Sequence, residues 1–150
     1  MKAFKQKVHE LLVSQVNDKI QLYQTQLHEL QQSAAEETKS TAGDKHETAL
    51  AMLQIEQENI QRRLDEARLQ KSALGKINFE SKTEQVVAGS LIKTGKGYFI
   101  LSIALGKVVV EDKTVIALSP QSPLGKNFLT AKEKDIVEFN GNRYRIETIE

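Results

Sequence analysis

The sequence of 150 residues has no cysteine, two prolines and few aromatic side chains, and neither sign of charge predominates. Without cysteine, neither a disulfide framework nor a thiolate metal site can form. The 21 lysines and arginines stand against 20 aspartates and glutamates. Residues 1–75 carry 10 basic and 11 acidic side chains, and residues 76–150 carry 11 and 9. Because coating a nucleic acid requires an excess of cations that displaces counterions, we expect no bulk electrostatic binding and no sequence-specific DNA binding.

Long apolar runs are also lacking. No stretch approaches the roughly 18 apolar residues of a membrane-spanning helix. The N-terminal MKAFKQKVHELLVSQ has positive charges but no apolar run long enough for a signal peptide. We therefore expect a cytoplasmic protein with no membrane partner.

The first half is rich in helix-forming residues and has two apolar stripes at helical spacing. One runs from Val8 to Ala34 in steps of three or four, and a less regular one runs from Ala49 to Leu74. Between them, residues 38–44 collect small and helix-breaking side chains. The pattern predicts an antiparallel coiled-coil hairpin over residues 1–75, with its tip at about residues 38–47. A coiled-coil arm that pairs with a second copy fits the same periodicity.

The second half, residues 76–150, is typical of β structure with one short helix. The predicted strands cover residues 85–92, 98–105, 107–110, 114–118, 136–139 and 143–146. Asn140-Gly141 between the last two predicts a tight hairpin turn. Ser122 before Pro123 predicts the capped start of a short helix. We thus predict an α+β protein, with a helical hairpin followed by a small antiparallel sheet domain.

Signatures of a self-sufficient enzyme are missing. The sequence has no glycine-rich phosphate loop, no nucleophile elbow and no histidine pair at zinc-ligand spacing. His9 and His28 fall on the polar side of the first helix, where we expect solvated surface residues. The protein is not expected to carry an active site of its own.

One acidic pair at the predicted tip has a chemical interpretation. Asp44 and Glu47 are three residues apart at the start of a helix, so their carboxylates are expected on one side of the first turn. They fit a capping arrangement in which Asp44 precedes the helix and both charges complement its dipole. They also fit the recruitment of Mg²⁺ to a partner's active site, because Mg²⁺ prefers oxygen ligands and keeps several waters.

A basic cluster on the second predicted helix also allows two interpretations. It comprises Arg62, Arg63, Arg68 and Lys71. These side chains are expected to be solvated and paired with Asp65 and Glu66, as surface charges usually are. Alternatively, they follow an RNA backbone.

Two stretches resemble the Gre family of bacterial transcript-cleavage factors. Gly43 to Ala49, read as Gly-Asp-Lys-His-Glu-Thr-Ala, is similar to the family's Gly-Asp-x-x-Glu-Asn-Ala segment. Ser119 to Lys126, followed by the strand at 135–139, is similar to the family's Ser-Pro-(Ile/Leu)-Gly helix and the strands after it. The order of elements agrees across nearly the whole chain, so the sequence resembles a divergent member.

The resemblance implies a fold and a function. Family members combine a long N-terminal hairpin with an FKBP-like domain that docks at the rim of the RNA polymerase secondary channel. The hairpin tip then helps to hold a catalytic Mg²⁺ and stimulates the polymerase's own cleavage of backtracked RNA. Carried over, Asp44 and Glu47 would contact the Mg²⁺, which is shared with the polymerase and not tightly bound. Ser122, Pro123, Leu124 and Gly125 would form the C-terminal motif, with capping and packing as their expected role.

The tip departs from the family pattern after Glu47. The family usually has Asn, Ala, an acidic residue and Tyr, whereas this chain has Thr48, Ala49, Leu50 and Ala51. Relatives with altered tips bind the same channel and inhibit the polymerase. The resemblance thus implies a polymerase-binding factor that meets nascent RNA only indirectly, and we expect it to be a monomer. Two alternatives remain: a channel-binding inhibitor without cleavage activity, and a coiled-coil dimerising adaptor.

Overall fold

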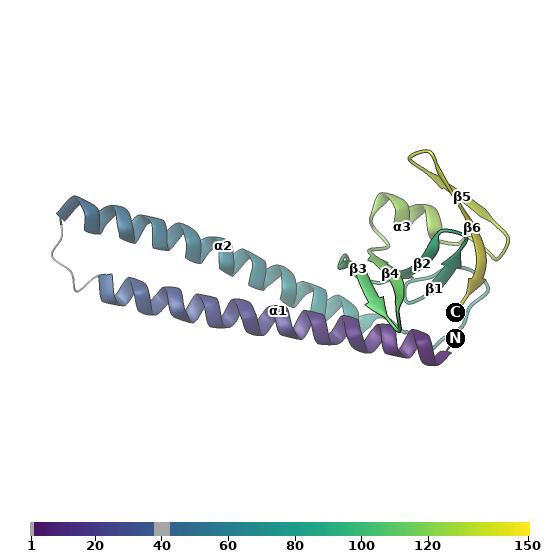
Figure 1. The fold of residues 1–150 in the computed structure, drawn as a ribbon, viewed down its shortest axis with the longest axis horizontal. Coiled ribbons are helices and arrows are strands. Elements are labelled where there is room, and N and C mark those ends of the chain that lie inside the picture. The colour runs from purple at the N-terminus through teal and green to yellow at the C-terminus, as the bar shows by residue number, and fades with distance from the viewer. Residues whose placement is uncertain (1, 38–42) are drawn as a thin grey trace. The chain divides into compact units, whose positions relative to one another are not determined.

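The computed structural model describes residues 2–37 and 43–150, and the side chains of residues 2–37 and 47–150. The elements of this part are α1 (Lys2–Glu37), α2 (Gly43–Lys76), β1 (Leu91–Thr94), β2 (Gly97–Leu101), β3 (Gly106–Val110), β4 (Lys113–Leu118), α3 (Pro123–Phe128), β5 (Ile136–Phe139) and β6 (Asn142–Ile149) (Figure 1). The predicted class is confirmed: two long helices come first, and a sheet with one short helix follows. Half of the predicted tip, residues 38–42, lies outside the described residues.

The chain divides into two compact units. One comprises Met1–Ser14 and Ser72–Glu150, and the other comprises Gln15–Lys71. The predicted division at residue 75 followed the change from helix to strand signals. By compactness, the unit that holds the sheet also takes the first turns of α1 and the last residues of α2.

The sheet is mixed rather than wholly antiparallel. Its strand order is β3-β4-β2-β1-β6-β5, and β2 pairs with β4 in parallel while the other neighbours pair antiparallel. The prediction of an antiparallel sheet was therefore wrong at this pair. After β3, the chain turns at Glu111 and Asp112 and returns as β4 between β3 and β2. Strand signals in a sequence identify strands and tight turns, but they do not say which non-consecutive strands become neighbours.

The first strand begins later than predicted. The segment 85–92 was expected to be one strand, but β1 starts at Leu91 and the chain turns at Gly89, where φ is +97°. A Cβ on Gly89 would lie 2.2 Å from the carbonyl oxygen of Asn78, so only glycine fits this close approach. Val86 is nevertheless fully buried and is bonded through its N–H to the Ala131 carbonyl at 2.9 Å.

The two faces of the sheet are covered by different elements. On one face, Phe99 and Phe128 pack with ring centroids 5.1 Å apart, and Tyr144 meets Phe99 edge-on at 5.3 Å. The rest of this core comes from Val86, Ile92, Leu101, Leu118, Val137, Ile146 and Ile149. On the other face, Phe4 of α1 packs against Tyr98 at 5.2 Å. Alternation of side chains along β2 thus sends Phe99 towards α3 and Tyr98 towards α1.

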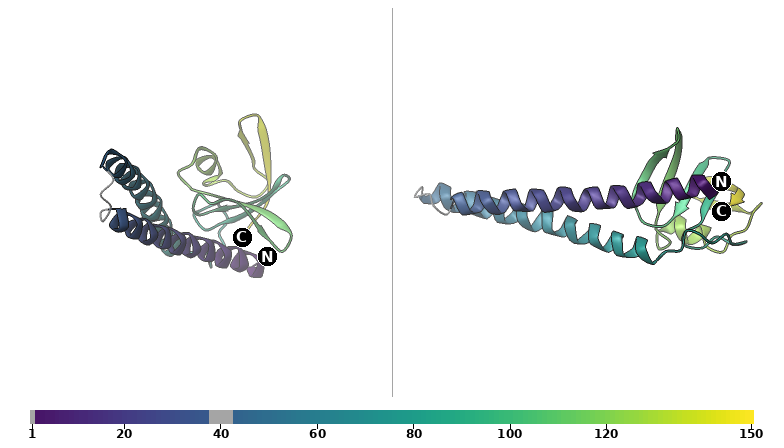
Figure 2. Two further views of the ribbon diagram at one scale, coloured as in Figure 1. Left: turned by 60° about the vertical axis from the view of Figure 1, so that its left-hand side comes forward. Right: turned by 90° about the horizontal axis from the view of Figure 1, so that it is seen from below.

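The start of α1 is tied to the sheet unit by buried and charged contacts. The Lys5 ammonium is buried and donates to the carbonyl oxygens of Ser81 at 3.2 Å and Glu150 at 2.9 Å. Lys7 also pairs with Glu111. Figure 2 shows the start of α1 beside the C-terminal end of the chain in both views. Burial lowers the pKa of the Lys5 amine, against the attraction of Glu150.

His9 is not the solvated surface residue that the sequence predicted. Its ring stacks on Phe79 at a centroid distance of 4.0 Å, and its side chain is half-buried. Burial lowers the pKa of His9 from its ordinary value, although Glu10 and Glu80 nearby favour the charged form. Helical periodicity placed this residue on the polar side of α1, but it could not show that Phe79 covers it. His28 is exposed, as expected.

The helical unit buries the predicted apolar stripes unevenly. Val16, Ile60, Leu64 and Ala67 are buried, while Ile20, Leu27, Leu30 and Leu53 are half-buried. Residues 26–33 of α1 and residues 56–63 of α2 line a shared groove, so the helices lie side by side in opposite directions (Figure 1). The prediction of an antiparallel hairpin is confirmed. Among the described helices, none is long and apolar enough to cross a membrane.

Candidate functional site

The acidic tip residues lie at the start of α2. Asp44 is the second residue of this helix and Glu47 the fifth, so they stay one helical turn apart. The Glu47 side chain is exposed, whereas that of Asp44 lies outside the described residues. No group of three or more potential metal ligands occurs within the described residues. A single exposed carboxylate with one neighbour a turn away suits a Mg²⁺ held mainly by another molecule, because Mg²⁺ keeps several waters.

The bounds of α2 change the capping interpretation of this pair. The sequence allowed Asp44 to precede the helix, but the helix begins at Gly43 and already includes Asp44. Asp44 therefore lies within the first turn, where its charge still complements the helix dipole. The exposed Glu47 carboxylate remains available for an interaction outside the helix.

The C-terminal motif starts α3 and is built as a helix cap. Ser122 has extended backbone angles and accepts a hydrogen bond from the Gly125 N–H at 3.0 Å. The Ser122 hydroxyl donates to the Ser119 carbonyl oxygen at 2.6 Å. Pro123 occupies the first helical position, where its missing N–H costs nothing. The predicted capping by Ser122 is confirmed.

The other two motif residues are placed by close packing. A Cβ on Gly125 would lie 2.0 Å from the Ser119 carbonyl oxygen and 2.7 Å from the Ser122 hydroxyl. The position thus excludes every other residue without movement of the turn. Leu124 packs against the apolar core that contains Phe128, which is fully buried. These contacts give the motif its packing role and leave Pro123 as its exposed member.

The four residues of the predicted basic cluster on α2 are placed at the surface. Arg62, Arg63, Arg68 and Lys71 are all exposed. Asp65 accepts a hydrogen bond from Gln61 at 3.0 Å, so this carboxylate is engaged by a neutral side chain on its own helix. Arg63 lines the groove between the helices together with Glu56. The cluster is accessible, and its contact with RNA stays a prediction.

Sequence reasoning did not single out an exposed apolar sector on the hairpin. Met52, Ile55 and Leu69 of α2 are 66%, 59% and 70% exposed. At 3.6 residues per turn they fall in a sector of about 100°, turned away from the buried Ile60 and Leu64. The sequence did hold a signal for this sector, because Ile55 is an apolar residue that lies off the predicted helix–helix seam. A sector of this kind is a candidate contact surface.

Comparisons with known proteins give a match among solved structures only. No family model and no curated protein match the chain. Among solved structures, the chain is similar to the transcription factor Gfh1, with 19% identity over 91% of this chain and 92% of that chain and a TM-score of 0.38.

Proposed function

We propose that this protein is an RNA polymerase-binding transcription factor that enters the secondary channel with its hairpin and stimulates cleavage of backtracked RNA. The observation that carries the proposal is the position of two motifs on one chain. The Gly43–Ala49 segment begins the second helix of the hairpin, and the Ser122–Gly125 motif begins the only short helix of the described sheet unit. Both segments resemble the Gre family, and the order of the elements agrees with that resemblance.

In this proposal the protein supplies ligands but no complete active site. Asp44 and Glu47 would add carboxylate oxygens to a Mg²⁺ whose other ligands come from the polymerase and water. A metal ion held in this way can generate a nucleophilic hydroxide and stabilise an in-line displacement at phosphorus. The exposed Glu47 can reach a partner without unfolding of the hairpin. We infer that Mg²⁺ binds only within the complex.

The test is RNA cleavage in a stalled, backtracked bacterial RNA polymerase complex. We compare the wild type with the Asp44→Ala/Glu47→Ala variant at equal occupancy of the polymerase. We expect the wild type to shorten the transcript and the variant to bind without cleavage. The loss should be at least about 100-fold in rate, since removal of one transition-state stabilising group commonly costs that much.

A charge-matched control separates the tip from net charge. Glu58 and Glu66 are exposed on the same helix, so Glu58→Ala/Glu66→Ala removes two charges elsewhere on the hairpin. This control should cleave like the wild type. Equal losses in both double variants would refute a specific role for Asp44 and Glu47.

A channel-binding inhibitor is the second candidate, and the residues after Glu47 favour it. Thr48 and Ala51 are exposed and Leu50 is half-buried, where the family has Asn, Tyr and an acidic residue. If wild-type protein binds the polymerase and slows elongation but never shortens the transcript, inhibition replaces cleavage stimulation. Polymerase binding itself would then still stand.

A dimerising adaptor is the third candidate. The exposed Met52, Ile55 and Leu69 are the observation in its favour, because a second hairpin could cover them. This candidate requires a dimer in solution and no affinity for RNA polymerase. Failure to bind the polymerase, together with a dimeric mass, would favour it over both channel factors.

A further inference from the structure

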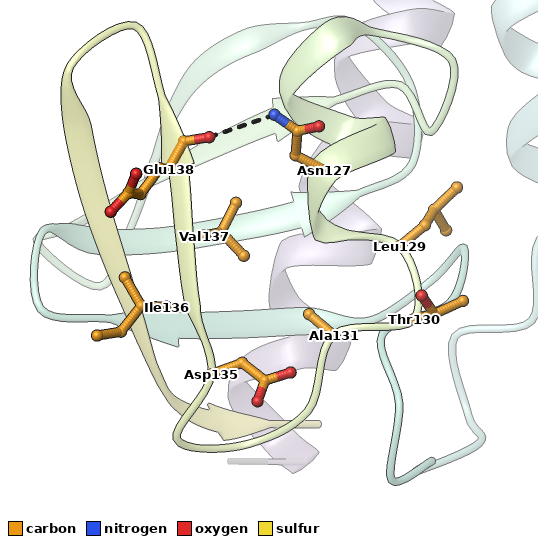
Figure 3. Close-up of a pocket in the computed structure, with 8 residues that line it drawn as sticks. All are labelled: Asn127, Leu129, Thr130, Ala131, Asp135, Ile136, Val137 and Glu138. Carbon is orange, nitrogen blue, oxygen red and sulfur yellow. Dashed lines mark hydrogen bonds between the residues drawn. The ribbon is translucent and has the colours of Figure 1, made fainter.

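One edge of the sheet faces a groove that the proposed function does not use. The edge is β5, and the groove has a volume of about 490 Å³. It is lined by Asn127, Leu129, Thr130, Ala131, Asp135, Ile136, Val137 and Glu138 (Figure 3). One wall is therefore strand β5, and the other is the end of α3 with the segment after it.

The turn that joins β5 to β6 fixes which backbone groups face the groove. Asn140 and Gly141 form a two-residue turn with φ of 50° and 77°, so the flanking Phe139 is hydrogen-bonded to β6. Bonded and unbonded residues alternate in an antiparallel pair, so Val137 is also bonded to β6. Ile136 and Glu138 consequently direct their N–H and C=O groups away from β6.

Two bonds at the other end of the pair confirm this alternation. The Ile146 N–H donates to the Asp135 carbonyl at 2.9 Å, so Asp135 faces β6. The carbonyl of Arg145, the cross-strand neighbour of Ile136, accepts from the Gly95 N–H at 3.3 Å and thus points away from β5. Within the described part of the chain, the backbone N–H groups of Ile136 and Glu138 have no hydrogen-bond partner.

The opposite wall is held in place by the core. Thr130 donates its N–H to the Val86 carbonyl at 2.9 Å, and the Val86 N–H donates to Ala131 at 2.9 Å. These two bonds hold Thr130 at φ of 67°, which a β-branched residue rarely adopts. Asn127 crosses the groove at one end, where its side-chain amide donates to the Glu138 carbonyl at 3.4 Å (Figure 3). Because this hydrogen bond is long and its donor is an exposed side chain, a peptide N–H can replace it with a shorter hydrogen bond to the Glu138 carbonyl.

The groove carries negative charge. Two exposed carboxylates, Asp135 and Glu138, line it, and no lysine or arginine does. Asp135 uses one oxygen to accept from the Lys132 N–H at 2.9 Å, and Glu138 meets Arg143 at 3.1 Å. A peptide segment in the groove would bind more tightly if it placed a cationic side chain near one of these carboxylates.

We propose that the β5 edge binds an extended peptide segment that carries a lysine or arginine, by addition of a strand to the sheet. The outward groups of Ile136 and Glu138 repeat every second residue, which is the spacing that a paired strand requires. The Glu138 carboxylate favours the basic side chain on one face of the strand, and Val137 forms the buried floor on the other face. The site lies on the sheet unit and needs neither the hairpin tip nor RNA polymerase.

The experiment uses the full chain and a defined probe. The probe is an eight-residue peptide of alternating threonine and valine with one central lysine and blocked ends. We expect it to slow amide hydrogen exchange at Ile136 and Glu138, and to leave Lys107 and Val109 on the opposite edge strand β3 unchanged. The same peptide with glutamate for lysine should bind about tenfold more weakly at low salt, because the groove is acidic.

Matched variants distinguish strand addition from nonspecific binding of the peptide. Ile136→Pro removes an outward N–H and leaves the β6 ladder intact, so it should weaken binding about tenfold or more. Ile136→Val retains the N–H and should bind like the wild type. A probe that is N-methylated at alternate residues should not bind to any protein variant.

Three outcomes would overturn the proposal. They are unchanged exchange at Ile136 and Glu138 with millimolar lysine probe, slowed exchange on β3 instead, and equal binding by wild type and Ile136→Pro. If Ile136→Pro does not fold, the N-methylated probe and Glu138→Gln decide. Glu138→Gln should reduce the preference for lysine over glutamate, whereas Glu147→Gln, on an exposed residue outside the groove, should not.

Discussion

At the scale of single residues, close approach of backbone and side chain fixes the start of α3. Ser122 closes the first turn with its hydroxyl, and Gly125 lies against the Ser119 carbonyl. The resemblance to the Gre family identified these positions, and the contacts explain why serine and glycine stand there. Pro123 is the exposed residue between them.

Replacement of Gly125 by alanine should destabilise the sheet unit. The new Cβ would overlap the Ser119 carbonyl at 2.0 Å, and overpacking of this kind costs about 1–3 kcal/mol. Chemical denaturation monitored by tyrosine fluorescence measures the loss. Gly75→Ala is the control, because nothing lies within 4 Å of its Cβ and alanine favours a helix by up to about 1 kcal/mol. An unchanged free energy of unfolding for Gly125→Ala would mean that the turn from Ser119 to Ser122 shifts to accommodate the new Cβ.

His9 should give the protein a pH-dependent stability. Its folded pKa lies below the ordinary value of 6.5 because it is buried against Phe79, so the unfolded chain binds the proton more tightly. Stability should therefore be full above about pH 6.5 and should fall as the pH drops through 6.5 towards the folded pKa. Denaturation curves between pH 7.5 and 5.5 measure this slope. The His9→Phe variant should have a shallower slope, and an unchanged slope would contradict the assignment.

At the scale of elements, burial divides each hairpin helix into two sides. The buried side of α2 contains Ile60, Leu64 and Ala67, and the exposed apolar sector contains Met52, Ile55 and Leu69. The two sides should contribute differently to the free energy of unfolding, because only the buried side chains lose contact with water on folding. The exposed sector is then free for a partner.

Leu64→Ala and Leu69→Ala form a matched pair that tests this division. Leu64 is 2% exposed and should cost about 2–5 kcal/mol when truncated. Leu69 is 70% exposed and should change stability by less than about 0.5 kcal/mol. Loss of helical circular dichroism on denaturation measures both. Equal costs would indicate that Leu69 is covered in solution, as a dimer would require.

At the scale of the whole molecule, the three candidate functions predict different assemblies. A channel factor should be a monomer until it meets RNA polymerase, whereas the adaptor should be a dimer. Light scattering between about 1 and 100 µM should give the monomer mass of 16.9 kDa throughout. A mass that doubles with concentration would favour the adaptor, and Ile55→Glu should then restore the monomer.

The sequence alone determined the elements that local rules specify. Apolar spacing gave both helices and their antiparallel seam, because periodicity is a property of one helix. Asn140-Gly141 gave the β5–β6 hairpin and Ser122-Pro123 gave the start of α3, because turn and cap chemistry is local. The acidic pair at Asp44 and Glu47 was also found by spacing, and its role stays a prediction.

The tertiary structure decided what depends on residues distant in the chain. The first strand begins only after Gly89, where the chain turns beside the Asn78 carbonyl. The parallel β2–β4 pair follows from the return of β4 between two earlier strands. His9 is half-buried because Phe79 covers it, and Ile136 faces a groove because α3 and its following segment form the other wall. No local pattern encodes such neighbours, since each contact is created only when the chain folds back on itself.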